Sequence, residues 1–322
     1  MRVLITGGMG VIGAEASRKF VREGHRPVIY ARHRDESLIR DIVDKVDIEL
    51  GSILDRARLA EVIKARGITH VVHTAAYISA LSAAQPAESV EINVMGTVNV
   101  LEAARAANVA RVVYTSAKGV YGPFLGAYGA PTYKLVTEDH PKEPKRIYDS
   151  AKLMGEHATL YWATLGLDVV VLRFATTYGP GKTARHGNMG VTSQIVEQPA
   201  NGQPFRLAKG GDEKDDFIYN KDSALGIYLA VMAKNPASRI YNIGTGIGVT
   251  LKDVAAILRR HLPHAVIEIG PGLNFLGSPY PMHGIYDISR AQKELGYRPE
   301  FDLERGVADY LESLQRLKLQ AA

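Results

Sequence analysis

The first half of the chain alternates short apolar segments with longer stretches in which apolar residues recur at helical spacing. The short segments are four to six residues long, rich in Val and Ile, and bounded by Gly or polar residues. Strands that are buried on both faces have this pattern, so each segment is predicted to be a strand of an internal sheet. The predicted strands are Arg2–Thr6, Pro27–Ala31, Val46–Leu50, His70–His73, Arg111–Thr115 and Asp168–Arg173.

Helices are predicted between these strands. Ile12–Glu23 ends before Gly24, a residue type that favours the backbone conformation found just after helix C-termini. Val90–Ala107 carries apolar residues close to a helical period. Alternation of strands and helices builds an α/β fold around a doubly wound parallel sheet.

Gly and Pro become frequent after about residue 180, and strands and helices no longer alternate evenly. We therefore expect a larger domain over residues 1–175 and a smaller lobe, with loops that contribute to a pocket, over most of residues 176–322. Phe217–Lys234 and Ile240–Gly244 are expected to return to the larger domain, so that segments near 217–246 interleave the two.

Composition excludes several classes of protein. The 322 residues are 46% hydrophobic and 23% charged, and the net charge of +5 is spread without a basic block, so nucleic acid is not an expected partner. The absence of cysteine excludes disulfides and thiolate chemistry. The histidines form no helical pair with metal-ligand spacing, so no metal is expected. No signal-peptide core or long apolar run occurs, which predicts a cytoplasmic protein with no membrane partner.

A Gly-rich turn, Thr6-Gly7-Gly8-Met9-Gly10-Val11-Ile12-Gly13, follows the first predicted strand and opens the first predicted helix. Glycines here permit a tight turn, let the backbone approach a pyrophosphate and let the helix pack closely on the strand. The free N–H groups and the dipole of the helix N-terminus attract the phosphates. A Rossmann-type dinucleotide site is therefore predicted at Gly7, Gly10, Val11, Ile12 and Gly13.

The residues after the second predicted strand bear on which dinucleotide binds. An acidic side chain there would bind the ribose 2′-hydroxyl of NAD. This chain has Ala31 at that place, followed by Arg32 and Arg34, and a guanidinium matches a phosphate with a bidentate fork. NADP is therefore favoured over NAD. The alternative is that the arginines belong to a solvated loop and that NAD binds through other contacts.

Tyr148 and Lys152 are four residues apart in a segment predicted to be helical, which places the phenol and the ammonium on one helical face. A free phenol has a pKa of about 10 and is a weak base at neutral pH, but a nearby cation lowers that pKa. Lys152 and the positive nicotinamide ring are expected to supply this field. Tyr148 would then exchange a proton with a carbinol as a hydride passes to or from the dinucleotide.

Together with further motifs, these features resemble the extended short-chain dehydrogenase/reductases, in particular the NAD-dependent epimerase/dehydratase family. The resemblance covers nearly the whole chain. Its further motifs are His73-Thr74-Ala75-Ala76, Asn93 in Glu91–Thr97, Val120-Tyr121-Gly122, Thr137–Pro141, Tyr178-Gly179-Pro180-Gly181, Asp216–Tyr219, Tyr241–Gly246 and Glu294–Pro299.

The family implies that Tyr148 is the acid/base and that Lys152 holds the nicotinamide ribose. It also implies a homodimer that packs through the helices predicted over 90–107 and 148–165. The residues expected to complete the cofactor site are Ser52, Ile53, Thr74, Ala75, Ala76 and Asn93.

One catalytic position departs from the family pattern. Members usually carry a catalytic Ser or Thr four residues before the Tyr of the Val-Tyr-Gly motif, where this chain has Ala117. Ser116 is adjacent, but neighbouring strand side chains face opposite sides of a sheet. Three interpretations stay open: a local shift brings Ser116 into place, another donor such as Lys118 acts, or the alanine was introduced to trap a complex. Dehydratases carry an acidic pair just after this position, where Lys118-Gly119 stands, so elimination chemistry is not supported.

The substrate side departs as well. Members that act on nucleotide-linked sugars keep an Asn before Tyr-Gly-Pro and an Arg before Asp-Phe, whereas these places hold Thr176 and Asp215. A carboxylate repels the diphosphate with which an Arg would pair, unless adjacent Lys214 takes that role. A substrate without a nucleotide is therefore favoured. The expected substrate-binding residues are Tyr77, Ser79, Lys118, Tyr148, Thr176, Arg185 and His186.

These patterns favour an NAD(P)-dependent oxidoreductase that transfers a hydride reversibly at a secondary alcohol or ketone. Its expected partner is a carbohydrate-like small molecule, namely a sugar, sugar acid or polyol that is not linked to a nucleotide. The alternative is an NAD-dependent sugar or nucleotide-sugar epimerase that retains its cofactor. Ala117 also suggests a third interpretation, a non-catalytic regulator that binds a dinucleotide. The intact pair of Tyr148 and Lys152 argues against it.

Overall fold

The computed structural model describes residues 1–183 and 190–319. Its central element is a sheet of seven parallel strands in the order β3-β2-β1-β4-β5-β6-β10. The strands are β1 (Val3–Thr6), β2 (Val28–Ala31), β3 (Asp47–Leu50), β4 (His70–His73), β5 (Arg111–Ala117), β6 (Val169–Phe174) and β10 (Ile240–Ile243). The first six agree with the predicted strands to within two residues, and the expected doubly wound α/β fold is confirmed.

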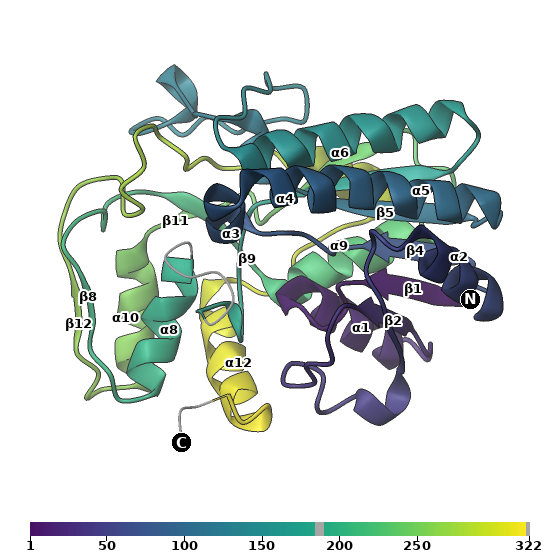
Figure 1. The fold of residues 1–322 in the computed structure, drawn as a ribbon. Helices are drawn as coiled ribbons and strands as arrows, with labels where there is room; N and C mark the ends of the chain where they lie inside the picture. Colours follow the sequence, from purple (N-terminus) through teal and green to yellow (C-terminus); the bar gives the residue numbers. More distant parts are fainter. Residues whose placement is uncertain (184–189, 320–322) are drawn as a thin grey trace.

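Helices cover both faces of this sheet (Figure 1). One face is covered by α1 (Val11–Arg22) and α9 (Asn220–Met232), and the other by α2 (Arg56–Ala65), α5 (Gly96–Ala106) and α6 (Ile147–Thr164). Successive strand residues serve opposite faces, because Val113 packs in the apolar cluster of Phe20 from α1, whereas Val112 packs in that of Val100 from α5. The Val-rich strands are thus buried on both sides, which is why their sequences do not alternate with polar residues.

The helix predicted over Val90–Ala107 begins earlier and changes its winding. It consists of α4 (Pro86–Val90), a π-helical turn (Glu91–Met95) and α5, and it follows the short helix α3 (Ser79–Ala84). Proline suits the first turn of a helix, because its fixed φ is already helical and its missing N–H is not needed there. The π-helical turn carries Asn93, which is buried against the segment after β4.

The smaller lobe lies to the left in Figure 1 and is built around α8, α10 and α12. Its elements are β7 (Thr176–Tyr178), α8 (Val191–Ala200), β8 (Phe205–Leu207), β9 (Asp215–Tyr219), β11 (Gly248–Val249), α10 (Leu251–His261), β12 (Ile267–Ile269) and α12 (Leu303–Arg316). β9 pairs with β7 and β11, and β8 pairs with β12. The chain returns to the central sheet in between, since α9 packs on α1 and β10 lies beside β6, and α11 (Ser289–Leu295) packs near β10.

Candidate active site

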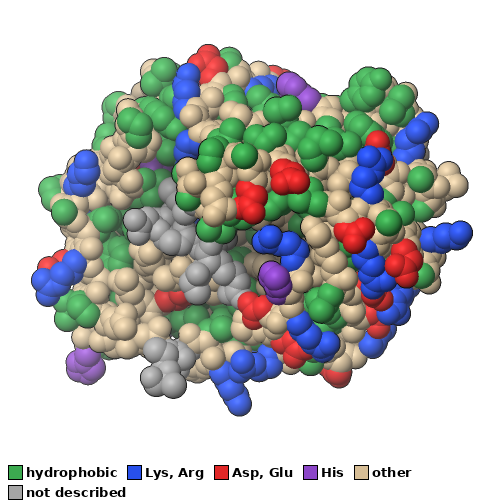
Figure 2. Space-filling view, in the orientation of Figure 1, with side chains coloured by type: hydrophobic (Ala, Val, Ile, Leu, Met, Phe, Trp, Pro, Cys, Tyr) green, Lys and Arg blue, Asp and Glu red, His purple; other side chains and the backbone are tan. Residues whose placement is uncertain are grey.

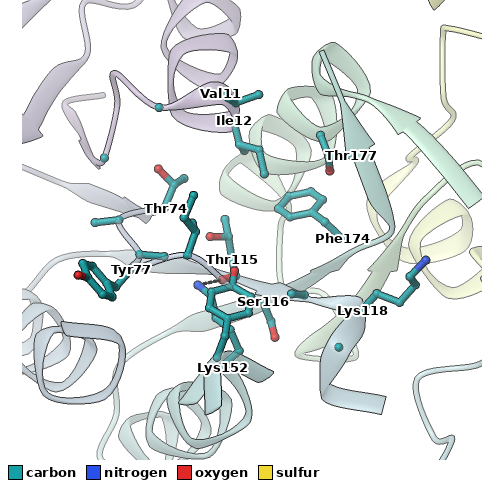
Figure 3. Close-up of a pocket in the computed structure, with 18 of the residues that line it drawn as sticks. Val11, Ile12, Thr74, Tyr77, Thr115, Ser116, Lys118, Lys152, Phe174 and Thr177 are labelled. Atoms are coloured by element: carbon teal, nitrogen blue, oxygen red, sulfur yellow. Dashed lines mark hydrogen bonds between the residues drawn. The ribbon is translucent and has the colours of Figure 1, made fainter. Parts of the chain in front are cut away.

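A cavity of about 560 Å³ opens at the carboxyl end of the parallel sheet. Crevices form there because β1 and β4 are neighbours in the sheet while the intervening chain runs outward to β2 and β3. Figure 3 shows side chains from both lobes converging on this space. The sequence-predicted residues that line it are Gly7, Gly10, Val11, Ile12, Gly13, Ala31, Arg32, Ser52, Ile53, Thr74, Ala75, Ala76, Tyr77, Ser116, Lys118, Tyr148, Lys152 and Thr176.

Two positions of the Gly-rich loop require glycine because a side chain there would meet the protein's own backbone. A Cβ on Gly7, whose φ is +71°, would lie 2.8 Å from the backbone of Ala75. A Cβ on Gly13 would lie 2.2 Å from the carbonyl oxygen of Gly7, so glycine lets α1 start close against the loop. Gly10 is the N-cap of α1 and makes no side-chain cap hydrogen bond, which leaves N–H groups of the first turn for an anion. The loop therefore fits the pyrophosphate of a dinucleotide.

Two expected cofactor residues, Arg34 and Asn93, are not among the residues that line the cavity, and their contacts with a cofactor stay predictions. Arg34 is exposed and pairs with Glu36. Asn93 is buried, where its Oδ1 accepts from the N–H of Tyr77 at 2.7 Å and its Nδ2 donates to the carbonyl oxygen of Tyr77 at 2.9 Å. An amide side chain matches a peptide group in this way. Asn93 therefore holds the loop after β4 in place from behind.

Tyr148 and Lys152 lie one turn apart at the start of α6 and both line the cavity. The Nζ of Lys152 is 5.9 Å from the centre of the Tyr148 ring and donates to the carbonyl oxygen of Thr115 at 2.8 Å (Figure 3). Burial lowers the pKa of Lys152 to about 8, although Glu156 opposes the change, so the charged form is lost as pH rises through that value.

The pKa of Tyr148 differs from the expectation. Burial, and after it the charge of Asp149, raises this pKa above its usual value, although Arg146 opposes the change. An enclosed phenolate loses its hydration, and this effect is larger than the fields of its neighbours. The expected lowering therefore depends on the positive nicotinamide ring of a bound dinucleotide.

Ala117 ends β5 and presents a methyl group to the cavity where the family pattern has a hydroxyl. Neither neighbouring hydroxyl replaces it, because the Oγ of Ser116 donates to Glu156 at 2.5 Å and the Oγ1 of Thr115 donates to the carbonyl oxygen of His73 at 2.9 Å. In the structure the Ser116 hydroxyl is engaged by Glu156, and a catalytic role for Ser116 stays a prediction. Alternation along the strand directs its hydroxyl toward α6.

The turn after β5, which contains Gly119, packs closely against the start of α6. A Cβ on Gly119 would lie 1.9 Å from Oδ1 of Asp149. Arg146 holds the carboxylate of Asp149 with two hydrogen bonds, of 2.6 and 2.9 Å. Because Asp149 follows Tyr148 directly, this contact fixes the first turn of α6 relative to the end of β5.

Lys118 extends away from Lys152 toward the smaller lobe (Figure 3). Its Nζ donates to Oγ1 of Thr176 at 2.7 Å and pairs with the carboxylate of Asp215. Asp215 also accepts from Thr176 at 2.6 Å, and Nδ1 of His283 lies 2.9 Å from it. With these partners, Lys118 is not placed to replace the hydroxyl that Ala117 lacks.

The charge of Asp215 does not act as the sequence suggested. Burial alone would raise the pKa of this carboxyl, but Lys118 and His283 outweigh burial and hold the pKa below its usual range. Asp215 has no exposed surface and does not line the cavity, whereas Lys118 does. The expectation that this carboxylate faces a substrate diphosphate was therefore wrong, because its charge is taken up by neighbours that the sequence separates widely.

The other residues that were expected to bind the substrate differ in where the structure places them. Tyr77 lines the cavity, but its hydroxyl donates to Gln85 at 2.7 Å. Ser79 is the first residue of α3, with a side chain outside the described part, and Arg185 and His186 lie outside the described residues. The lining residues that the sequence reasoning missed include Arg146, Asp149, Lys182, Thr192, Tyr280 and His283. Lys182 directly follows the Tyr-Gly-Pro-Gly motif, a signal that was available, whereas nothing local connects His283 with Asp215.

Two absences apply to residues 1–183 and 190–319. Within these ranges, no three His, Asp or Glu side chains are grouped as a metal site requires. None of the helices described there combines the length and the apolar composition needed to cross a bilayer.

Comparison with known proteins agrees with the fold. A model of the NAD dependent epimerase/dehydratase family matches residues 3–244. A Methanocaldococcus jannaschii protein, provisionally named UDP-glucose 4-epimerase, is 30% identical over 308 residues, which are 95% of each chain. The UDP-glucose 4-epimerase of Mycolicibacterium smegmatis is 29% identical over 97% of this chain and 98% of its own. The crystal structure of the Thermus thermophilus UDP-glucose 4-epimerase in complex with NAD has a TM-score of 0.82, at 26% identity, and covers 98% of this chain and 99% of its own. This chain is therefore an enzyme of the NAD-dependent epimerase/dehydratase family, within the extended short-chain dehydrogenase/reductases.

Proposed function

We propose that this enzyme is an NAD-dependent epimerase that inverts a secondary alcohol of a nucleotide-linked sugar and retains its dinucleotide through the cycle. The observation that carries the proposal is the position of Tyr148 and Lys152 in the same cavity as the Gly-rich loop. The names of the relatives support a nucleotide-linked sugar, which was the alternative interpretation of the sequence.

The residues of the cavity have distinct tasks in such a reaction. A bound dinucleotide supplies the acceptor for the carbinol hydride and the donor that returns it to the other face. Tyr148 takes the carbinol proton at its phenolic oxygen and gives it back when the alcohol is restored. Lys152 is anchored on Thr115 and has further N–H donors for ribose hydroxyls. Because Ala117 offers no hydrogen bond, the reacting oxygen depends strongly on Tyr148.

A second candidate is a dehydrogenase of sugars or sugar acids that carry no nucleotide. Thr176 and Asp215, at the places of the family's Asn and Arg, favour it. Repulsion between Asp215 and a substrate diphosphate no longer supports this candidate, because Asp215 is buried and paired with Lys118. The nucleotide-linked substrate is therefore our first proposal.

We propose NAD rather than NADP as the dinucleotide, which revises the preference drawn from the two arginines. Of the two arginines, Arg32 lines the cavity, whereas Arg34 is not among the lining residues and pairs with Glu36. The NAD complex of the Thermus thermophilus structure supports the same choice.

Desalting followed by an assay tests the proposed function. The purified protein should retain NAD in near-equimolar amount after extensive desalting, and it should convert UDP-glucose into its C4 epimer without net formation of reduced dinucleotide. Loss of dinucleotide on desalting, with reduction of added NAD or NADP by free sugars or sugar acids, would instead establish the dehydrogenase. A chain that binds NAD but transforms none of these compounds would be a non-catalytic binding protein.

Ala117→Ser is expected to raise kcat about tenfold. The new hydroxyl would stand at the end of β5, on the cavity side, and would donate a hydrogen bond to the reacting oxygen. Such donors contribute about 10²- to 10³-fold in sites built around them, and this one would enter a site built without it. Initial rates with UDP-glucose measure the effect, and Ala117→Val is the control for added bulk. Equal rates for Ala117→Ser and wild type would show that position 117 is remote from the reacting oxygen.

The helices proposed to mediate a homodimer carry an exposed apolar surface. Val90, Met95, Met154 and Tyr161 are exposed on α4, the π-helical turn and α6. Figure 2 shows hydrophobic side chains gathered over this upper part of the molecule. Apolar patches of this kind mark surfaces that associate with partners, and a second copy of the chain is the partner we propose.

A further inference from the structure

Lys182 is a buried cation that the reaction at Tyr148 does not use. It directly follows the Tyr178–Gly181 motif, is 8% exposed and lines the cavity. Its Nζ donates to the carbonyl oxygen of Thr177. An ammonium has three N–H donors, and a charged group taken out of water is costly unless it is paired. The position of Lys182 is therefore expensive unless an anion enters the cavity.

Among the described residues, the neighbouring charges compensate this cation only in part. Asp215 is the carboxylate that acts on Lys182, but it lies behind the cavity surface and is engaged by Lys118, Thr176 and His283. Lys118 itself lines the cavity, and its charge acts unfavourably on Lys182. The ammonium groups of Lys118 and Lys182 thus border the same part of the cavity. The carboxylate of Asp215 is the countercharge for both and does not line the cavity.

We propose that Lys182, assisted by Lys118, binds an anionic group of the substrate in the part of the cavity next to the smaller lobe. This inference rests on the proposed function and names the contact that its substrate makes. The chemistry required is an oxyanion that accepts N–H bonds from an ammonium, and such charge-assisted bonds are strong. The diphosphate of a nucleotide-linked sugar and the carboxylate of a sugar acid both supply it.

The two lysines also account for the departures in this region. Thr176 and Asp215 replace the family's Asn and Arg, and in the structure both serve to position Lys118. Lys182 belongs to the segment that follows β7. The positive charge of the subsite is therefore supplied by residues other than those at the family's positions, from two elements that are 64 residues apart in the sequence.

Calorimetric titration of the protein saturated with NAD tests this subsite. The probes are UDP, uridine and glucuronate, and the variants are Lys182→Met, Lys182→Arg and the control Lys209→Met, which removes an exposed lysine of the same lobe away from the cavity. Lys182→Met should bind UDP about tenfold to hundredfold more weakly than wild type, because a hydrogen bond to a charged group is lost. Lys182→Arg should recover most of the affinity, and Lys209→Met should match wild type.

The outcomes separate the two sources of the anion and the two proposals. Binding of UDP but not uridine, with dependence on Lys182, assigns a diphosphate. Binding of glucuronate with the same dependence, and no binding of UDP, assigns a carboxylate and overturns the nucleotide-linked substrate while the subsite stands. Equal affinity of wild type and Lys182→Met for every anion that binds, or no binding of either anion to wild type, overturns the subsite. In that case, conversion of UDP-glucose by wild type would still uphold the proposed function.

Discussion

Tyr148→Phe is expected to lower kcat by about 10²- to 10⁴-fold, the contribution that a positioned acid/base makes to a proton transfer. The phenol lies at the start of α6 beside Lys152, and removal of its oxygen leaves Ala117 as a neighbour with no hydroxyl to take over. The fold should not change, because the ring itself is kept. The measurement is the initial rate of UDP-glucose epimerisation together with the amount of NAD that the variant retains.

A matched control is present on the same helix. Tyr161 is 60% exposed on the outer side of α6, so Tyr161→Phe removes an equivalent oxygen far from the cavity and should leave kcat unchanged. Retention of NAD by Tyr148→Phe, with the rate lost, would assign the defect to proton transfer. An undiminished rate in Tyr148→Phe would refute the mechanism, whatever the substrate proves to be.

Arg173→Met is expected to lower the free energy of unfolding by about 3–5 kcal/mol, the typical result of removing one partner of a buried ion pair. Arg173 and Glu156 are each 1% exposed and are joined at 2.6 Å. The guanidinium also donates to the hydroxyl of Tyr121 at 3.0 Å and to the carbonyl oxygen of Glu138 at 2.9 Å. Methionine would fill the space but would leave the buried charge of Glu156 without a countercharge and would remove the donor to the Tyr121 hydroxyl and the Glu138 carbonyl oxygen.

Urea unfolding of the NAD-free protein measures this effect, with Arg206→Met as the control. Arg206 pairs with Glu268 at 3.3 Å, but both side chains are more than half exposed, so its loss should cost no more than about 1 kcal/mol. Similar unfolding free energies for the two variants would contradict the larger loss expected for the buried pair between β6 and α6.

Features that depend on neighbouring residues could be predicted from the sequence. The central strands follow from the density of Val and Ile, and the shared face of Tyr148 and Lys152 follows from a spacing of four residues on a helix. The alternation of strand side chains already argued against Ser116, and its hydrogen bond to Glu156 agrees with that argument. The roles of the cavity residues remain predictions, although most of the expected positions line the same space.

Features that depend on contacts across the fold could not be predicted. From the sequence, Asp215 was expected to be an unpaired carboxylate. Its partners Lys118 and His283 are 97 and 68 residues away along the chain, so the sequence does not show these contacts. Asn93 was expected to bind the cofactor. Its partner in the structure is the backbone of Tyr77, and a contact with a backbone group cannot be recognised from the residue type. The pKa of Tyr148 rises through burial, and burial is decided by the packing of the whole domain rather than by the adjacent lysine.

The close contact between Gly119 and Asp149 restricts how this scaffold could acquire a new chemistry. The resemblance places the acidic pair of the family's dehydratases at the positions of Lys118 and Gly119, and here a Cβ at 119 would lie 1.9 Å from Oδ1 of Asp149, so that the carboxylate held by Arg146 would have to move. Grafting the pair would therefore disturb the turn that carries Tyr148 and would dismantle the ion pair of Lys118. A path from this enzyme to a dehydratase has to rebuild the start of α6 first, so laboratory evolution by single substitutions at 118 and 119 should stall.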